Sequence, residues 1–373
     1  MKVATILGTR PEIIRLSRVM AALHRYTEHV IIHTGQNYDY ELNQVFFDDL
    51  EIRKPDYFLQ SAGKNAAETI GLVIAKSDDV LAVVQPDAVL ILGDTNSCLA
   101  ALAAKRRKIP VFHMEAGNRC FDERVPEEIN RRIIDHISDI NMPYSSIARE
   151  YLLREGLPPD RVIKTGSPMC EVLHHYLPRI RQSDVLERHS LQPQGYFLVS
   201  CHREENVDDA RQLERFVRLL NRLSAEYGLR IIVSTHPRIR KRLTESKADL
   251  RPEVDLQAPF GFFDYVQLEL NAKATLSDSG TISEESSILG FPALNLREAH
   301  ERPEGMEEAA VMMTGFDAGR VIECMKILAD QVKAGLRTVH DYQMPNVSEK
   351  VVRIIHSYVN YVNATVWRKA PES

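Results

Sequence analysis

The chain has 373 residues, 27% of them charged, and a formal net charge of −5 at pH 7. This length suits two domains that each bury a core, and the composition is that of a soluble globular protein. The negative charge, and the lack of basic runs interleaved with aromatic residues, argue against a nucleic-acid-binding surface.

Neither the cysteines nor the N-terminus indicates a secreted, metal-binding or membrane protein. The sequence has no C-x-x-C pair and no Cys/His spacing of a zinc site, so we expect buried thiols in a reducing cytoplasm. Met1-Lys2 leads directly into a strand that is too short for a signal peptide, and no stretch has membrane-spanning length. We therefore predict a cytoplasmic protein without a bound metal. The five cysteines are Cys98, Cys120, Cys170, Cys201 and Cys324.

Strands and helices alternate through the first half of the chain. Val3–Leu7 is a short apolar run that ends at Gly8, and Pro11 stands where a first helical turn accepts proline, which predicts a strand and then a helix over Pro11–Leu23. Further strands are expected at His29–His33, Ala88–Leu92 and Val111–Met114, and helices at Cys98–Lys105 and Glu127–Ile137.

The second half starts the same pattern again. Phe197–Cys201 predicts a strand, and Asp208–Tyr227 predicts a helix with one apolar face. Strands are also expected at Arg230–Thr235, Ala272–Ser277 and Ala293–Leu296, with helices from about Gly280 and over Ser348–Trp367.

This alternation predicts an α/β fold of two Rossmann-like domains, each with a parallel sheet, that face each other across a cleft. The carboxyl ends of the strands, next to the cleft, are the expected place for chemistry. We expect residues 1–167 to form the N-terminal domain and residues 168–349 the second. The helical stretch 350–373 is expected to pack back onto the first domain.

Two segments have the composition of phosphate sites. Gly8-Thr9-Arg10 offers backbone N–H groups and a guanidinium at a helix start, although an ordinary strand–helix turn has the same composition. The small residues in Asp278–Glu285 allow a diphosphate to approach, and Glu284 or Glu285 can accept from ribose hydroxyls; the alternative is a helix capped by Ser279. Arg302 can pair with phosphate or be solvated. A G-x-G-x-x-G fingerprint is missing after the first strand, so we expect no nicotinamide.

Several acidic residues stand at strand ends or helix starts. Asp94 follows a predicted strand, where active sites of this topology lie, but helix capping is the alternative. His113 and Glu115, two apart on a predicted strand, should share a face. Glu127 and Glu128 open a helix, where stabilising the helix dipole is the alternative. His202 is flanked by Arg203 and two glutamates in a strand-terminal loop, an environment that tunes a histidine.

Seven motifs occur in one order across nearly the whole chain. They are Gly8 to Glu12, Gly93 to Thr95, His113 to Gly117, Pro126 to Arg131, His202 to Glu204, Asp278 to Glu285, and Glu301 to Glu304. Together they resemble the non-hydrolysing UDP-N-acetylglucosamine 2-epimerase family. The resemblance implies a two-domain, glycosyltransferase-B-like fold with the catalytic carboxylates in the first domain and UDP bound by the second. It also implies an isomerase with a UDP-sugar substrate, no cofactor and a homodimeric state.

Matched position by position, the family's roles fall on twelve residues of this chain. The catalytic set is Asp94, Glu115, Glu127 and His202, and the UDP-binding set is Arg10, Arg15, Tyr265, Ser279, Gly280, Thr281, Glu285 and Arg302. Arg15 is a lysine in many relatives, and Thr281 replaces a common second glycine.

One branch of the family is closer than the rest. Three segments resemble the capsule and O-antigen enzymes that make UDP-N-acetyl-L-fucosamine by inverting C2 of UDP-2-acetamido-2,6-dideoxy-L-talose. They are His33 to Tyr40, Asn118 to Asp122, and Ile354 to Tyr358. Members that handle UDP-N-acetylglucosamine usually have Gln-His-Arg-Glu in place of Gln36 to Asp39, so the allosteric activation by that sugar nucleotide is not expected here. A UDP-N-acetylglucosamine/UDP-N-acetylmannosamine 2-epimerase is the alternative.

The chemistry explains the residue types. The C2 proton of a UDP-sugar is not next to a carbonyl, so an ordinary base cannot remove it reversibly without either transient oxidation or expulsion of UDP. Expulsion through a glycal needs cations for the diphosphate and at least two acid/base groups. A UDP-sugar glycosyltransferase of the same architecture and a non-catalytic nucleotide-sugar sensor are the rival interpretations, and the three carboxylate motifs argue against both.

Overall fold

The structure is a computed structural model that describes residues 1–35, 47, 49–201, 209–235, 237–246, 248–298, 302–331 and 338–369. The chain forms two compact units, Met1–Leu173 with Asp341–Ser373 and His174–His340. The predicted division after residue 167, and the predicted cleft between domains, remain predictions. Among the described residues, none of the helices has both the length and the apolar character that a membrane span requires.

The first unit is built on a six-stranded parallel sheet with the order β3-β2-β1-β4-β5-β6. Buried apolar runs such as β1 and β4 are typical of strands covered on both faces. The strands are β1 (Lys2–Leu7), β2 (Glu28–His33), β3 (Tyr57–Phe58), β4 (Ala88–Leu92), β5 (Val111–Met114) and β6 (Ile140–Met142). The helices are α1 (Arg10–Tyr26), α3 (Ala66–Val84), η1 (Asn96–Ala100), α4 (Ala101–Arg106), α5 (Pro126–Ile137), α6 (Ser146–Arg154), η2 (Pro159–Arg161), α7 (Met169–Arg181), which continues into the second unit, η4 (His340–Tyr342) and α16 (Val347–Thr365).

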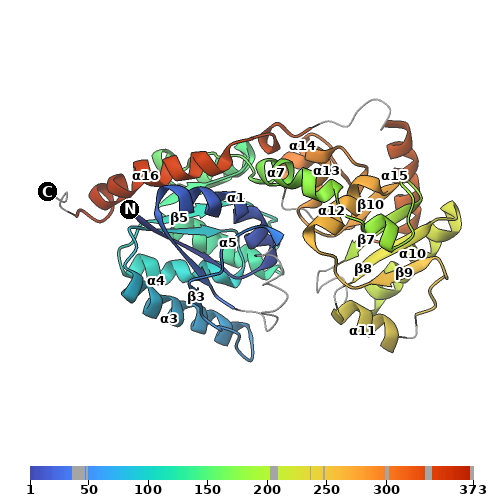
Figure 1. The fold of residues 1–373 in the computed structure, drawn as a ribbon, viewed down its shortest axis with the longest axis horizontal. Coiled ribbons are helices and arrows are strands. Elements are labelled where there is room, and N and C mark those ends of the chain that lie inside the picture. The colour runs from blue at the N-terminus through green and yellow to red at the C-terminus, as the bar shows by residue number, and fades with distance from the viewer. Residues whose placement is uncertain are drawn as a thin grey trace. The chain divides into compact units, whose positions relative to one another are not determined.

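Helices cover both faces of this sheet. Figure 1 shows α1 and α16 side by side on one face and α3 with α4 on the other. The helix predicted over Cys98–Lys105 is instead a 3₁₀ turn followed by α4, and the turn begins at Asn96, two residues earlier than expected, because Thr95 is its N-cap.

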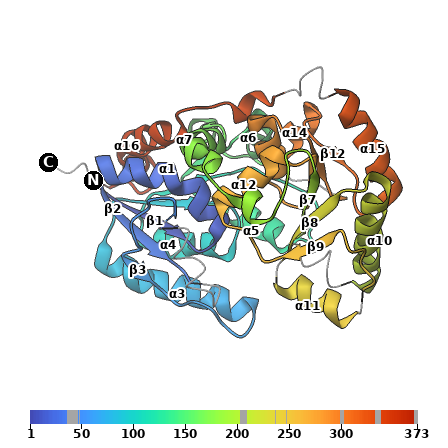
Figure 2. The same cartoon turned by 45° about the vertical axis from the view of Figure 1, so that its right-hand side comes forward.

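The second unit has a second six-stranded parallel sheet, β12-β11-β10-β7-β8-β9. Alternate residues of β7 enter two different cores: Phe197 and Val199 pack with α10 and α15, while Tyr196 and Leu198 pack on the α12 side. Figure 2 shows α10 and α15 together along one side of this unit. The strands are β7 (Tyr196–Cys201), β8 (Arg230–Thr235), β9 (Val254–Gln257), β10 (Ala274–Ser277), β11 (Ala293–Asn295) and β12 (Met312–Met313). The helices are α8 (Val185–Arg188), α10 (Ala210–Tyr227), α11 (Pro237–Glu245), α12 (Phe262–Asn271), α13 (Ile282–Leu289), α14 (Pro303–Glu307) and α15 (Ala318–Gln331).

Both sheets therefore have the doubly wound Rossmann order, which confirms the predicted α/β fold class. The strand order reverses between β1 and β4 in the first sheet and between β7 and β10 in the second. Ligands of such sheets bind beyond the carboxyl ends of the strands at the reversal. The expectation of buried thiols holds for Cys98, Cys170 and Cys201 but is wrong for Cys120 and Cys324, which are half-buried because they lie in a loop and on an outer helix.

Candidate active site

Glu12 joins the two loops at the reversal point of the first sheet. Its carboxylate accepts the backbone N–H groups of Gly8 at 2.5 Å and Thr9 at 2.8 Å, and the Thr95 hydroxyl at 2.6 Å. Burial raises the pKa of Glu12 to about 7, although these three donors act to lower it. The phosphate-type loop that ends at Arg10 is thus attached to the loop after β4. Glu12 is the last residue of the motif that starts at Gly8, but the motif by itself predicted no role for this side chain.

Asp94 is held by α5. Its Oδ2 accepts a hydrogen bond of 2.7 Å from Nε of Arg131, and its carbonyl oxygen accepts one of 2.9 Å from Asn130. The capping alternative for Asp94 is wrong, because Thr95 is the residue whose side chain accepts the Ser97 N–H. The half-buried carboxylate of Asp94 is therefore oriented by Arg131.

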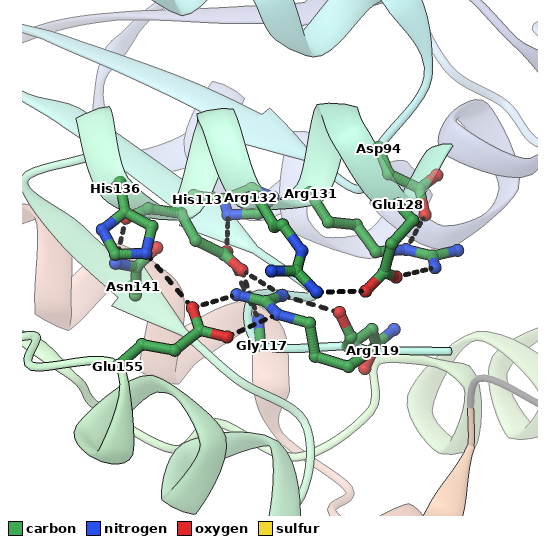
Figure 3. Close-up of polar contacts among 12 residues, drawn as sticks. Asp94, His113, Gly117, Arg119, Glu128, Arg131, Arg132, His136, Asn141 and Glu155 are labelled. Carbon is green, nitrogen blue, oxygen red and sulfur yellow. Dashed lines mark hydrogen bonds and ion pairs between the residues drawn. The ribbon is translucent and has the colours of Figure 1, made fainter. Parts of the chain in front are cut away.

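The first turns of α5 supply the anchors for this arrangement (Figure 3). Arg131 is buried, and its Nη1 donates to Glu128 at 2.9 Å, while Glu128 also accepts the Cys120 N–H at 3.0 Å. Glu127, one residue earlier, is half-buried in the same first turn. Arg131 ends the motif from Pro126 to Arg131 but was not among the predicted site residues, although its place one turn after Glu127 on the same helix was the available signal.

Glu115 does not share a strand face with His113, so that prediction is wrong. β5 ends at Met114, and Glu115 has a left-handed backbone with φ of 65°. Its side chain therefore does not continue the alternation of side chains along the strand. Its carboxylate accepts from Arg15 and, at 3.2 Å, from Asn118. The structure therefore joins a predicted catalytic carboxylate to a predicted UDP-binding arginine.

Gly117 allows this turn to form. Its φ is 82°, and a Cβ atom there would lie 2.4 Å from the carbonyl oxygen of Ala148. A larger residue at this position would displace the turn that carries Glu115.

In the second unit, small polar residues follow β10. The Ser279 N–H donates to Ser277 at 3.1 Å, and the Thr281 N–H donates to Ser279 at 3.2 Å. Helix α13 begins at Ile282 with Thr281 at its N-cap, so the alternative of Ser279 as the cap is wrong. The Thr281 hydroxyl donates to Glu285 at 3.1 Å, which connects two predicted UDP-binding residues on either side of the helix start.

Arg302 is buried, not solvated. Its Nη2 lies 3.3 Å from a carboxylate oxygen of the fully buried Glu284. The solvated alternative is wrong because the guanidinium is enclosed and paired.

Helix α12 adds two groups behind the Ser277 loop. The Tyr265 hydroxyl bonds to Ser200 and Ser277, at the ends of β7 and β10, and burial raises its pKa well above the usual range. Glu269, one turn later, is fully buried, and burial followed by the charge of Glu285 raises its pKa well above the ordinary value. Glu269 was also missed, because it stands at an otherwise apolar helix position with no motif around it.

His202 and the residues that flank it, Arg203 to Asn206, lie outside the described residues, as do Gln36 to Tyr40 and Glu301. Within the described ranges, no group of three or more His, Cys, Asp or Glu side chains could hold a metal ion.

Residues 21–356 match the family model described as UDP-N-acetylglucosamine 2-epimerase. The chain is 34% identical to the UDP-N-acetylglucosamine 2-epimerase of Methanocaldococcus jannaschii, over 95% of this chain and 99% of that one. It is 32% identical to the UDP-2,3-diacetamido-2,3-dideoxy-D-glucuronate 2-epimerase of Pseudomonas aeruginosa, over 87% of this chain and 91% of that one.

Two solved structures are similar to this chain over almost its whole length. The structure of UDP-N-acetylglucosamine 2-epimerase from Rickettsia bellii superposes with a TM-score of 0.91 at 52% identity, covering 99% of this chain and 100% of that one. The Methanocaldococcus jannaschii structure in complex with UDP-GlcNAc and UDP superposes with a TM-score of 0.88 at 34% identity, covering 96% and 100%.

Proposed function

Because this chain belongs to the UDP-N-acetylglucosamine 2-epimerase family and is a non-hydrolysing UDP-sugar 2-epimerase, we propose that it inverts C2 by eliminating UDP and adding it back. The observation that carries the proposal is the pair of oriented carboxylates, Asp94 held by Arg131 and Glu115 held by Arg15. Their turns follow the neighbouring strands β4 and β5.

The proposed reaction has two half-steps. A carboxylate removes the C2 proton while the bond from C1 to the phosphate oxygen breaks, and the C–H electron pair becomes the C1–C2 double bond of the glycal. The glycal is then protonated at C2 on the opposite face, and UDP adds to C1. Asp94, Glu115 and Glu127 are the proposed acid/base groups, and each face needs one of them.

The departing diphosphate needs positive charge and N–H donors. We assign this role to Arg10, Arg15, His202 and Arg302. Ser279, Gly280, Thr281, Glu285 and Tyr265 are the proposed partners of the remaining UDP atoms. Their support is the position of the Ser277–Thr281 loop at the reversal point of the second sheet.

For the native sugar we propose UDP-2-acetamido-2,6-dideoxy-L-talose, giving UDP-N-acetyl-L-fucosamine for surface polysaccharide. The support is the resemblance of the segments Asn118 to Asp122 and Ile354 to Tyr358 to the enzymes that make this product. UDP-N-acetylglucosamine is the second candidate, and the names of the Rickettsia and Methanocaldococcus proteins favour it. The Pseudomonas relative, named for a diacetamido-glucuronate sugar, supports a family that accepts several 2-acetamido sugars. We also propose a homodimer.

Incubation with each UDP-sugar and no acceptor tests the proposal. A C2 isomer, with traces of free UDP and glycal, is the expected product, and the faster of the two substrates identifies the native sugar. Product that forms only when an acceptor is added would instead indicate a glycosyltransferase, and binding without any turnover would indicate a sensor. Light scattering measures the oligomeric state.

A further inference from the structure

Glu269 is a fully buried carboxyl group that the proposed chemistry leaves without a role. It lies on α12, one turn after Tyr265. Within the part of the chain that the structure describes, no N–H or O–H group donates to either of its carboxyl oxygens. The hydroxyl of the neighbouring Tyr196 donates instead to the carbonyl oxygen of Leu268, at 2.7 Å. Because a buried carboxylate without a donor is costly, this position favours an uncharged acid.

The side chain that faces Glu269 is another carboxyl group, that of Glu285 on α13. The two groups form a hydrogen bond with each other. Two carboxylates offer only acceptors, so this bond requires a proton on one of them. Like charges that are close together in a buried site also cannot both ionise. The pair therefore holds one proton in the folded protein.

The surroundings place this proton on Glu269. Glu285 accepts the Thr281 hydroxyl at 3.1 Å and lies in the first turn of α13, where the helix dipole stabilises a negative charge. Glu269 lies in the last turn of α12, where the dipole disfavours a negative charge. The other titratable groups beside the pair are the hydroxyls of Tyr196 and Tyr265, which keep their protons because burial raises the pKa of both.

Building on the proposed function, we propose that Glu269 is a positioning residue for recognition of the ribose of UDP. As a neutral acid it donates its O–H to Glu285 and keeps Glu285 an ionised acceptor for the ribose hydroxyls. A protonated Glu285 would turn one of its oxygens into a donor and lose part of this capacity. Tyr265, on the same helix, bonds Ser277 at the start of the loop, so α12 holds both the loop and the acceptor.

Calorimetry with UDP and with its 2′-deoxy and 3′-deoxy analogues tests the positioning role. In the original protein, loss of a hydroxyl that Glu285 accepts should weaken binding by roughly 10- to 100-fold. Glu269→Met removes the O–H, so Glu285 takes up the proton; UDP affinity should fall about 10-fold, and the preference for UDP over that analogue should shrink to about 3-fold or less. The analogue itself should bind this variant and the original protein alike, which shows that the variant is folded. Glu269→Gln keeps an N–H donor of the same shape and should keep the preference.

The matched control is Glu253→Gln, at an exposed position of the same unit, which should also keep the preference. Full preference in Glu269→Met, or equal loss of preference in Glu269→Gln and Glu269→Met, would overturn the role of Glu269. Glu285→Gln separates this failure from failure of the proposed function. If Glu285→Gln also keeps the preference, the proposed ribose contact itself is wrong; if only Glu285→Gln loses it, the contact stands and the role of Glu269 is refuted.

Infrared spectroscopy of the full chain tests the proton directly. At about pH 7, where an ordinary glutamate is ionised, the difference spectrum between the original protein and Glu269→Gln should contain the C=O stretch of a protonated carboxylic acid. Glu12→Gln is the matched control, because it removes another buried carboxyl with a raised pKa and should leave this band in place. Absence of the band from the original protein would overturn the proposal. This measurement depends on neither UDP nor turnover.

Discussion

Nε of Arg131 donates to Oδ2 of Asp94 at 2.7 Å, so an arginine on α5 sets the direction of a carboxylate that follows β4. The same guanidinium bonds Glu128 at 2.9 Å, and Glu128 accepts the N–H of Cys120. One side chain thus connects the Asp94 turn, the start of α5 and the loop before it. This depends on the planar fork of a guanidinium, which directs several donors at once.

Arg131→Lys is therefore expected to lower kcat by about 100-fold while UDP affinity stays near normal, since an ammonium cannot hold Asp94 and Glu128 together. Steady-state rates and calorimetry with UDP measure the two quantities. A double-mutant cycle with Asp94→Asn should be non-additive. Additive losses would show that Arg131 does not act through Asp94.

Each proposed acid/base carboxylate is tested by its neutral isostere. Asp94→Asn, Glu115→Gln and Glu127→Gln should each reduce turnover by roughly 100- to 10,000-fold, with UDP affinity nearly intact. Asp78→Asn is the control, because Asp78 is an exposed carboxylate paired with Arg107. If a variant keeps a near-normal rate, the substituted residue has a structural role and not a catalytic one. For Glu127 that role would be to stabilise the N-terminus of α5.

Turnover in D2O should place deuterium at C2 of the recovered product. The proposed carboxylates return a proton that has exchanged with water, so the label accompanies inversion. Mass spectrometry of product and recovered substrate measures it. Unlabelled product at full conversion would contradict the elimination route or require a proton fully shielded from solvent.

Glu12 should make stability depend on pH. Its pKa is raised to about 7 in the folded protein from 4.5, so the folded state keeps a proton that the unfolded chain loses. The free energy of unfolding should therefore fall as pH rises across this window, by about 3 kcal/mol for a fully buried group. Glu12→Gln should flatten this dependence and be most stabilising, relative to the original protein, above pH 7. Denaturant titrations at several pH values test it, and parallel curves for the two proteins would refute it.

Glu269→Gln is expected to stabilise the second unit at alkaline pH. Burial and then the charge of Glu285 raise the pKa of Glu269, so the folded protein holds this carboxyl in its protonated form. The unfolded chain loses that proton at a lower pH, and the free energy of unfolding therefore falls as pH rises. A neutral amide of the same shape avoids that loss of stability. Glu253→Gln, at an exposed position with a lowered pKa, is the control and should not stabilise. Thermal melts at increasing pH compare the variants, and a uniform loss of stability in Glu269→Gln would mean that the amide does not fit the site.

Local sequence determined most of the strands and the loops that follow them. Short apolar runs predicted the exact bounds of β4, β5 and β8, and they predicted all but the first residue of β1, β2 and β7. This works because a parallel strand that is buried on both faces consists of a continuous run of apolar residues. Glycines and small polar residues after these strands identified the loops with Asp94 and Ser279. Short elements such as β3, β6 and β12 were not predicted, since two or three residues carry no periodicity.

The partners of the site residues were decided only by the tertiary structure. The paired residues come from separate elements, so their pairing depends on strand order and helix placement. The pairs are Asp94 with Arg131, Arg15 with Glu115, and Tyr265 with Ser200 and Ser277. The assumption that His113 and Glu115 share a face was wrong because the strand ends between them and the backbone turns left-handed. Motifs read along the chain thus identified which residues carry chemistry. What holds each one in place, including the buried Glu12 and Glu269, depends on neighbours distant in sequence and on a desolvated environment that no local pattern encodes.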